Sequence, residues 1–162
     1  MMTDTSVEYV RLGSDTCSIQ RMEELNAMFA IAFEDEEHYA HHLPSKEHLA
    51  HFLSNQNHVV CVALAGDDVV GGLVAYVLEK FEQERSEVYI YDLAVLETYR
   101  RKKIATNLIR LLQKEVADTN AWVIFAQADP VDKPAVKLYE SLGIREDVYH
   151  FDIPVAKKDQ KN

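Results

Sequence analysis

The spacing of hydrophobic residues changes from helical to strand-like along the first half of the chain. Apolar residues such as Met22 and Leu25 recur every three to four positions over 18–33, and this period predicts a helix. Ser45, with Glu47 in the following turn, is the start signal of a second, shorter helix. Continuous apolar runs come next, interrupted by the turn triplet Gly66-Asp67-Asp68, which is a hairpin signal. The predicted elements are a strand at 9–12, helices at 18–33 and 45–55, and strands at 59–64 and 69–78.

Strand-like and helix-like segments alternate in the second half. A strong apolar strand is followed by a segment in which Ile104, Leu108 and Leu112 lie on one helical face, and then by another strand and helix. Gly143 is a natural stop for the last helix. The predicted elements are strands at 87–95 and 122–126, helices at 99–118 and 132–141, and a last strand pair at 144–147 and 149–153.

This order of elements predicts an α/β domain, or α+β in some schemes. Three antiparallel strands feed a strand–helix–strand unit, which gives a mixed sheet with helices on its faces. The chain has 162 residues, and no repeat, low-complexity tract or Pro/Gly/Ser-rich linker divides it. We therefore expect one domain over residues 1–162, with a polar tail at 156–162 that frays.

The chain is acidic, with 27 Asp and Glu against 17 Lys and Arg and a formal net charge of −10. A negative field of this size disfavours non-specific binding to nucleic acids or anionic membranes, and it attracts small cationic partners. Net charge also serves solubility, so it does not by itself specify a ligand. No apolar run approaches the ~20 residues of a membrane-spanning helix.

The cysteines and the N-terminal residues predict a cytoplasmic location. Cys17 and Cys61 stand far apart without a CxxC motif, and Cys61 lies in an apolar run, which favours a buried reduced thiol over a disulfide. The first eleven residues contain neither the basic nor the apolar region of a secretory signal peptide.

Seven histidines are present, but we expect no metal site. His48 and His51 have a helical i, i+3 spacing, and His38, His41 and His42 lie close together in the sequence. No cysteine or third ligand completes a recognised metal-binding pattern. Surface or packing roles are preferred for these side chains.

Four consecutive basic residues, 100–103, interrupt the acidic chain where a strand leads into a helix. The first N–H groups of a helix are unpaired and the helix dipole is positive there, so this position suits an anion such as a pyrophosphate. The same dipole disfavours cations at that end, which makes four of them unusual unless an anion binds. A solvated basic first turn is the alternative.

This segment resembles the acyl-CoA loop of the GNAT superfamily of N-acetyltransferases. The loop pattern in that family is Arg/Gln-x-x-Gly-x-Gly/Ala after a strand that ends like Leu-Ala-Val, as residues 93–95 do here. Arg100 and Ala105 match the first and last positions of the loop. Lys103 stands where the family usually has glycine, so its side chain either changes the backbone of the loop or adds a charge contact to the phosphates.

Further blocks are similar to the short, GNAT-type aminoglycoside 3-N-acetyltransferases and span about residues 69–153. They are Lys80-Phe81-Glu82-Gln83, Arg85-Ser86-Glu87, Tyr89-Ile90-Tyr91-Asp92-Leu93-Ala94-Val95, Ile104-Ala105-Thr106, Gln127-Ala128-Asp129, Leu142-Gly143-Ile144-Arg145-Glu146 and His150-Phe151-Asp152-Ile153. The N-terminal third matches less distinctly. The resemblance implies the GNAT fold, a mixed central sheet of about six to seven strands flanked by about four helices, and acetyl-CoA as cosubstrate.

The resemblance also implies which residues bind acetyl-CoA. In the family, the pantetheine arm pairs with the end of the central strand, and the following loop binds the pyrophosphate. A backbone N–H near Leu93 is the expected oxyanion donor for the tetrahedral intermediate. The implied residues are Leu93, Ala94 and Val95 for the pantetheine, and Arg100, Arg101, Lys102, Lys103, Ile104, Ala105 and Thr106 for the pyrophosphate.

Two residues are expected to act in catalysis. Tyr139 occupies the tyrosine position of the family, where the phenol protonates the departing thiolate, and core packing is the alternative. Asp92 interrupts an apolar strand, where a carboxylate is costly to bury unless a cation meets it. Its reference pKa near ~3.9 makes it a poor base unless burial raises that pKa, so its larger expected role is to orient the amine. The alternative is an aspartate that caps a bulge or pairs with an arginine.

Other acidic side chains are candidates for binding a polycation, because several Coulomb contacts add up in a partly desolvated cleft. A solvated surface role is the alternative for each of them. Four adjacent acids do not fit a protein core, and the other three lie in the matching blocks. The selected residues are Glu34, Asp35, Glu36, Glu37, Glu82, Asp129 and Asp152.

The implied function is acetylation of the 3-amino group of an aminoglycoside antibiotic, which confers resistance, by direct attack of the amine on the thioester. The expected partners are acetyl-CoA and the drug, without nucleic acid or membrane, and a homodimer is the family-like expectation. Two alternatives stay open. One is a GNAT enzyme for another amine, such as a polyamine or a peptide, and the other is a non-catalytic acyl-CoA-binding module.

Overall fold

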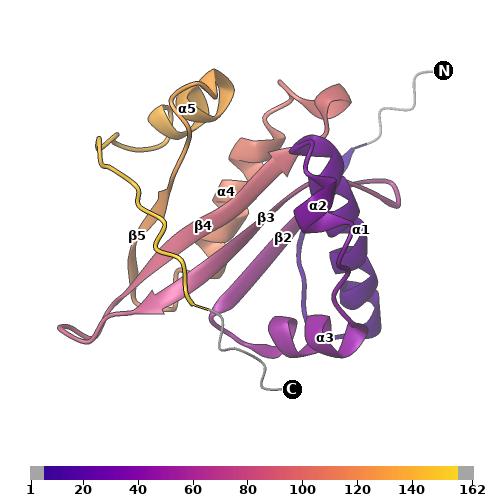
Figure 1. Cartoon of the computed structure of the whole chain (residues 1–162), viewed down its shortest axis with the longest axis horizontal. Coiled ribbons are helices and arrows are strands. Elements are labelled where there is room, and N and C mark those ends of the chain that lie inside the picture. The colour runs from indigo at the N-terminus through magenta and orange to yellow at the C-terminus, as the bar shows by residue number, and fades with distance from the viewer. Residues whose placement is uncertain (1–5, 157–162) are drawn as a thin grey trace.

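A mixed β-sheet with helices on both faces forms the framework of the protein (Figure 1). The computed structural model describes residues 6–156; residues 1–5 and most of the predicted tail, 157–162, lie outside the described range. The strands are β1 (Val7–Arg11), β2 (His58–Ala65), β3 (Asp68–Glu79), β4 (Ser86–Val95) and β5 (Ala121–Ala126), and this is also their order across the sheet. The helices are α1 (Thr16–Ala32), α2 (Glu36–Tyr39), α3 (Lys46–Ser54), α4 (Ile104–Glu115) and α5 (Lys133–Glu140), with a 3-10 turn at Glu97–Tyr99 before α4.

The sheet is antiparallel from β1 to β4 and parallel between β4 and β5. The crossover from β4 through α4 to β5 is the strand–helix–strand unit expected from the hydrophobic spacing. The predicted α/β class is therefore confirmed. Among the described residues, no helix has the length and apolar character needed to span a membrane.

Both faces of the central strands are buried, which explains why β2 reads as a continuous apolar run. Leu25 and Phe29 of α1 lie in the core on one face, and Leu108 and Leu112 of α4 lie in the core on the other. Gly72 of β3 has a specific packing reason, because a Cβ at this position would collide with the side chain of Leu25. The glycine thus lets α1 approach the sheet closely.

Strand β4 changes its pairing with both neighbours near one point. On the β3 side, Val74 pairs with Asp92 but Ala75 pairs with Ile90, so Tyr91 is an extra residue in a β-bulge. On the β5 side, the pairing stops after Ile90. A bulge re-aims the side chains beside it. The last residues of β4 therefore have one edge without a strand partner among residues 6–156.

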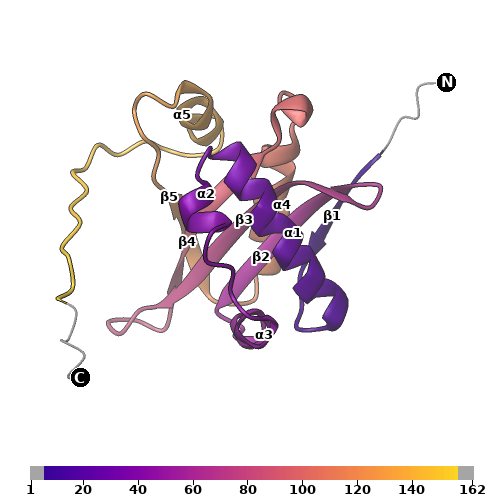
Figure 2. The ribbon, with the colours of Figure 1, turned by 45° about the vertical axis from the view of Figure 1, so that its right-hand side comes forward.

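The strand count and the C-terminal strand pair need correction. Within residues 6–156 the sheet has five strands instead of the expected six to seven, because the strands predicted at 144–147 and 149–153 do not form. This part of the chain is extended but stands apart from β5 (Figure 2). A strand needs a neighbouring edge for its backbone hydrogen bonds, and alternating apolar residues alone do not provide one.

The helices also differ from expectation at two places. The short helix α2 forms within the acidic segment after α1, so the described chain has five α-helices where about four were expected. The helix predicted over 99–118 is replaced by the 3-10 turn, a loop and the shorter α4. In this loop Arg101 and Lys103 have positive φ angles of 64° and 62°, which interrupt the helix although the apolar spacing suggests that it begins earlier.

Candidate active site

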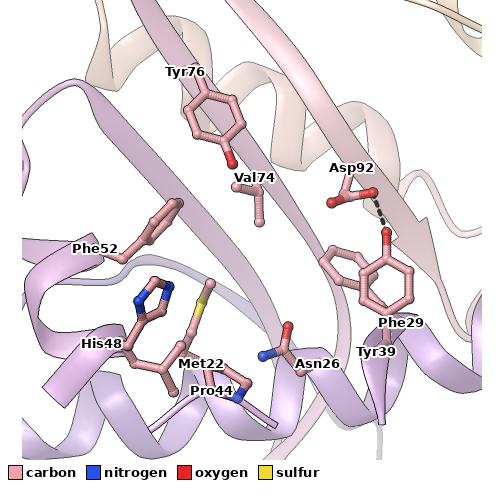
Figure 3. Close-up of a pocket in the computed structure, with 11 residues that line it drawn as sticks. Met22, Asn26, Phe29, Tyr39, Pro44, His48, Phe52, Val74, Tyr76 and Asp92 are labelled. Atoms are coloured by element: carbon pink, nitrogen blue, oxygen red, sulfur yellow. Dashed lines mark hydrogen bonds between the residues drawn. The ribbon is translucent and has the colours of Figure 1, made fainter. Parts of the chain in front are cut away.

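Asp92 follows the bulge in β4, and its side chain is half-buried. Tyr39 of α2 donates a hydrogen bond from its hydroxyl to Oδ1 of Asp92, with 2.6 Å between the two oxygens (Figure 3). Within residues 6–156, no lysine or arginine forms an ion pair with this carboxylate. The ion pair with an arginine, which was one alternative from the sequence, is thus absent there, and only Oδ1 of the carboxylate has a hydrogen-bond donor among these residues.

The carboxylate of Asp92 borders a pocket of about 190 Å³ between the sheet and the first three helices (Figure 3). Its lining is mostly apolar or aromatic, with a few polar groups from different elements. The lining residues are Met22, Asn26 and Phe29 from α1, Tyr39 from α2, Pro44 from the next loop, His48, Leu49 and Phe52 from α3, Val74 and Tyr76 from β3, and Asp92 from β4. A pocket of this kind suits an amine carried on a carbon framework.

Burial changes the ionisation of both members of the Tyr39–Asp92 pair. It raises the pKa of Asp92 above the usual range, and the hydrogen bond from Tyr39 opposes this shift. Burial, followed by the hydrogen bond to Asp92, raises the pKa of Tyr39. Tyr39 is therefore a neutral donor at physiological pH. The sequence predicts that Asp92 is a poor base unless burial raises its pKa, and burial does raise that pKa.

The acidic residues 34–37 contribute charge, and one of them also helps to position Tyr39. Asp35 caps the N-terminus of α2, because its side chain accepts a hydrogen bond from the backbone N–H of His38 at 3.1 Å. The ring of Tyr39 packs against Phe29 and Phe33, with centroids 5.7 and 5.5 Å apart. Asp35 thus starts the helix whose last residue reaches Asp92.

The predicted cosubstrate residues lie along the open edge of β4 and at the start of α4. Residues 93–95 have β3 on one side and, within the described residues, no strand on the other. Arg100 donates from Nε to the carbonyl oxygen of Val95 at 3.0 Å, which joins the loop to the strand end. An extended arm can add to such an edge as a further strand.

The N-terminus of α4 has free backbone donors. No side chain among the described residues caps it, and the first backbone bond of the helix runs from the N–H of Asn107 to the oxygen of Lys103 at 3.0 Å. The N–H groups of residues 104–106 therefore remain available to an anion. The edge of β4 and this helix start together fit an extended thioester arm with a pyrophosphate at its end.

Lys103 occupies the left-handed region with φ 62° and ψ 18°, although it carries a side chain. This is the backbone region that glycine adopts without a steric cost. The loop thus keeps a glycine-like conformation at the position where the family usually has glycine. The lysine at this position therefore adds a side chain that glycine lacks, but the left-handed backbone is the same.

Tyr139 lies in α5 and packs, partly buried, against the core on the α4 face of the sheet. Burial raises the pKa of its phenol to about 12, so the hydroxyl is protonated at neutral pH. A protonated phenol is the form that a proton donor requires. The predicted catalytic role of Tyr139 is therefore compatible with its packing against the core.

None of the predicted substrate acids lines the pocket. Each lies at the surface of the protein, and most have a hydrogen-bond or ion-pair partner nearby in the sequence. Asp35 contacts His38, Glu36 lies 3.9 Å from His41, Glu82 pairs with Lys80 and Arg85, Asp129 accepts from the N–H of Val131, and Asp152 contacts His150, while Glu34 and Glu37 are exposed. Their role in substrate binding stays a prediction.

Sequence reasoning missed several residues that surround Asp92. Tyr39, His48 and Tyr76 border the same pocket but come from three different elements. The signal for Tyr39 was its place two residues after the run of four acids, and His48 belonged to the histidine pair that received no specific role. Spacing along the chain does not reveal that these elements converge.

Comparisons with solved structures show close relatives. The aminoglycoside acetyltransferase HMB0005, from an uncultured soil metagenomic sample, is 46% identical, with a TM-score of 0.90 over 93% of this chain and 99% of that chain. The aminoglycoside acetyltransferase meta-AAC0020 in complex with sisomicin, also from an uncultured soil metagenomic sample, is 32% identical, with a TM-score of 0.84 over 93% of this chain and 97% of that one.

Curated relatives carry a different name. An N-alpha-acetyltransferase of Saccharolobus solfataricus is 33% identical over 95 residues, which are 52% of this chain and 54% of that protein. The human N-alpha-acetyltransferase 30 is 31% identical over 86 residues, 53% of this chain and 24% of that protein. The chain thus spans about half the length, or less, of these curated relatives.

The model of the acetyltransferase (GNAT) family matches residues 21–144. This range contains the bulged β4, the open strand edge and the uncapped start of α4. Acetyl-CoA is the cosubstrate of GNAT acetyltransferases, and the strand edge and helix start fit its pantetheine arm and pyrophosphate. The chain therefore belongs to the GNAT family of acetyltransferases.

Proposed function

We propose that this protein transfers the acetyl group of acetyl-CoA to the 3-amino group of aminoglycoside antibiotics and thereby confers resistance. The observation that carries this proposal is Asp92, a half-buried carboxylate without a cationic partner in the described chain, at the border of an aromatic-lined pocket. A buried carboxylate of this kind is stabilised when an ammonium group binds beside it. The 46% identity to an aminoglycoside acetyltransferase supports the choice of drug.

The pocket size suggests how such a substrate binds. Its volume of about 190 Å³ is below the ~300–1,000 Å³ of sites that enclose a drug-sized ligand. The pocket therefore takes the amine-bearing edge of one ring, and the remaining rings stay outside. Tyr76 and Phe52 offer ring faces beside the amine, where cation–π attraction adds to the charge of Asp92. Acetylation removes a positive charge and so weakens attraction to RNA phosphates.

Asp92 and Tyr39 divide the work on the amine. Tyr39 holds Oδ1 of the carboxylate, so Oδ2 is free to orient the ammonium and to accept its proton, directly or through water. The raised pKa of Asp92 brings it closer to that of the amine and makes this transfer less uphill. The deprotonated nitrogen then has the lone pair that direct attack requires.

The cosubstrate is proposed to lie along the open edge of β4 and over the N-terminus of α4. When bound, acetyl-CoA supplies the acetyl thioester. The backbone of residues 93–95 orients the arm, the N–H of Leu93 donates to the carbonyl oxygen, and the N–H groups of 104–106 with the basic loop bind the pyrophosphate. Tyr139 gives its hydroxyl proton to the departing sulfur.

Release of the CoA thiol tests this function. Purified protein is mixed with acetyl-CoA and gentamicin or sisomicin, and the product is analysed by NMR for the position of the acetyl group. We expect thiol release that depends on the drug, acetylation at the 3-amino group, and a rise in resistance when a susceptible bacterium carries the gene. Asp92→Asn should abolish release and leave acetyl-CoA binding intact; unchanged turnover would remove the assignment.

A peptide N-terminus is the second candidate substrate, because the curated relatives are N-alpha-acetyltransferases. The same thiol assay with a set of peptides, and with spermidine as a polyamine control, separates the candidates. Faster release with peptides than with any aminoglycoside would favour this second function. Binding of acetyl-CoA without release by any amine would instead identify an acyl-CoA-binding module.

We also propose a cytoplasmic location, on the basis of the two cysteines. Both are free; Cys61 is buried and Cys17 is exposed. Burial raises the pKa of the Cys61 thiol to about 12, which keeps it in the unreactive form. A chain whose cysteines are both free, one exposed and one buried, is typical of proteins from a reducing compartment.

A further inference from the structure

Three polar side chains border the pocket of Asp92 without a partner of their own. They are Asn26 of α1, His48 of α3 and Tyr76 of β3. Within residues 6–156, the amide of Asn26, the imidazole of His48 and the hydroxyl of Tyr76 make no hydrogen bond or ion pair. These groups are therefore available to a ligand that enters the pocket.

Asn26 lies on the apolar face of α1. Met22 is one turn before it and Phe29 one turn after it, so the three side chains share one face of the helix, and all three line the pocket. In the middle of a helix, asparagine is a weaker helix former than leucine. An apolar residue would therefore suit both the helix and the core here, and a bound ligand explains the amide better than folding does.

His48 reaches the same pocket from α3. It lies one turn before Phe52 on this helix, and both residues line the pocket. Figure 3 shows the ring of His48 and the carboxylate of Asp92 at opposite ends of the pocket, with Asn26 and Tyr76 on the two sides between them. The pocket thus has a carboxylate at one end and uncharged hydrogen-bonding groups around the rest of its wall.

The chemistry of these side chains matches a hydroxyl group better than a second ammonium group. An amide, a neutral imidazole and a phenol can each donate and accept hydrogen bonds, as a hydroxyl group does. An ammonium group only donates, and it requires an anionic partner when it leaves water. Asp92 is the only acid among the described residues that line the pocket. The end away from Asp92 therefore suits a hydroxyl group.

We propose that Asn26 and His48 bind a hydroxyl group on the ring that carries the reacting amine. The pocket then selects amines on a hydroxylated ring over amines of equal charge that lack hydroxyl groups. This inference rests on the proposed function, because the amine is placed at Asp92. The rest of the lining is mostly apolar, and in such a site a missing substrate hydroxyl leaves protein groups unpaired, which is the strongest basis for rejecting an analogue.

Two small ring diamines measure this selection. 2-Deoxystreptamine is the central ring of many aminoglycosides, and cis-1,3-diaminocyclohexane has the same ring and amines without the hydroxyl groups. NMR titration of the purified protein with each compound gives the ratio of their dissociation constants. Comparing this ratio between protein and variants cancels the difference in basicity of the two diamines. We expect a preference for 2-deoxystreptamine that Asn26→Leu and His48→Phe each reduce by about tenfold, the usual effect of losing one such hydrogen bond.

His51→Phe is the matched control, since His51 lies on the same helix but does not line the pocket. It should leave the preference unchanged. His48→Gln keeps a donor and an acceptor and should retain most of the preference that His48→Phe loses. The proposal is overturned if the unaltered protein binds neither diamine or both equally. It is also overturned if the preference survives in both Asn26→Leu and His48→Phe, or falls as far in His51→Phe.

Binding of the diamines separates this proposal from the function on which it rests, because the titration requires no turnover. A preference that depends on Asn26 and His48 supports the proposal even where no aminoglycoside is acetylated, and the proposed function then fails alone. Conversely, drug-dependent thiol release together with an unchanged preference in both variants refutes the hydroxyl contact and leaves the acetyltransferase function standing.

Discussion

The hydroxyl of Tyr39 and the carboxylate of Asp92 lie 2.6 Å apart, although 53 positions separate them in the sequence. The hydrogen bond joins the short helix α2 to the bulged strand β4 at the border of the pocket. It satisfies one oxygen of a half-buried carboxylate without neutralising its charge. Asp92 is therefore oriented and remains an anion to which an ammonium group can bind.

Replacing Tyr39 by phenylalanine should move the pH dependence of acetyl transfer. The hydrogen bond from Tyr39 lowers the pKa of Asp92 against the larger effect of burial. Its removal therefore raises that pKa, and the acidic limb of the kcat/KM profile should shift to higher pH. Turnover should fall by about 10-fold or more, because the unbound carboxylate oxygen loses its orientation.

The control for this change is Tyr91→Phe, whose hydroxyl has no hydrogen bond partner in the described chain and whose ring is 62% exposed. It should leave the acidic limb in place. An identical profile for Tyr39→Phe and the unaltered protein would show that the bond does not influence the reacting amine.

Asp92→Asn should separate activity from stability. Folding raises the pKa of Asp92, so its ionised form disfavours the folded state. The stability linked to this group is complete below its unfolded pKa of ~3.9 and is lost as the pH rises through the folded value. At pH 7 asparagine avoids this loss, and we expect the free energy of unfolding in urea to be unchanged or higher.

Activity of the same variant should decrease by about 10²-fold or more, the usual contribution of a positioned proton acceptor. The isosteric amide still accepts the hydrogen bond from Tyr39, so the local structure is retained. Loss of stability in parallel with loss of activity would instead indicate a structural role for Asp92.

Tyr139→Phe should slow turnover with little change in the KM for the amine. Burial raises the pKa of its phenol to about 12, so the hydroxyl carries a proton at neutral pH and can donate it to the leaving sulfur. We expect kcat to fall by about 10- to 100-fold. Since the ring that packs against the core is kept, thermal unfolding should change little. An unaltered kcat would leave only the packing role.

Lys103→Gly should be tolerated by the fold. Lys103 has a φ of 62°, and a residue with a Cβ pays roughly 1 kcal/mol or more for this conformation. Glycine removes that cost but gains freedom in the unfolded chain, so we expect stability to rise by about 0–1 kcal/mol. Lys102→Gly is the control, because Lys102 has no positive φ, and it should only destabilise. Denaturation in urea measures both.

The affinity of Lys103→Gly for acetyl-CoA reports on the side chain. A loss of up to about tenfold that shrinks at high salt would indicate a charge contact from Lys103 to phosphate. Equal affinities at all salt concentrations would show that the backbone donors of 104–106 suffice.

Local patterns predicted the parts of the fold that depend on neighbours in the sequence. The period of α1, the hairpin of β2 and β3, and the β4–α4–β5 crossover all follow from the spacing of apolar residues. The basic block before α4 was also visible as an anomaly of charge. The left-handed backbone at Lys103 was not, because the spacing of Ile104 and Leu108 is helical whether the helix starts at 99 or at 104.

The candidate site divides in the same way. Asp92 could be singled out because a carboxylate in an apolar strand is visible without any structure. Its partner Tyr39 could not, since the bulge at Tyr91 and the close packing of α1 on Gly72 bring α2 over β4. The acids at 34–37 looked like a ligand surface, yet Asp35 serves to start a helix.

The sequence by itself determined the α/β class, the conspicuous carboxylate at Asp92 and the basic start of α4, because periodicity and buried charge are properties of short stretches. Only the tertiary structure decided that Tyr39 holds this carboxylate, and that the alternating residues after Gly143 stand apart from β5 within the described chain. Hydrogen bonds and strand pairing depend on which distant backbone comes near, and no local pattern specifies that approach.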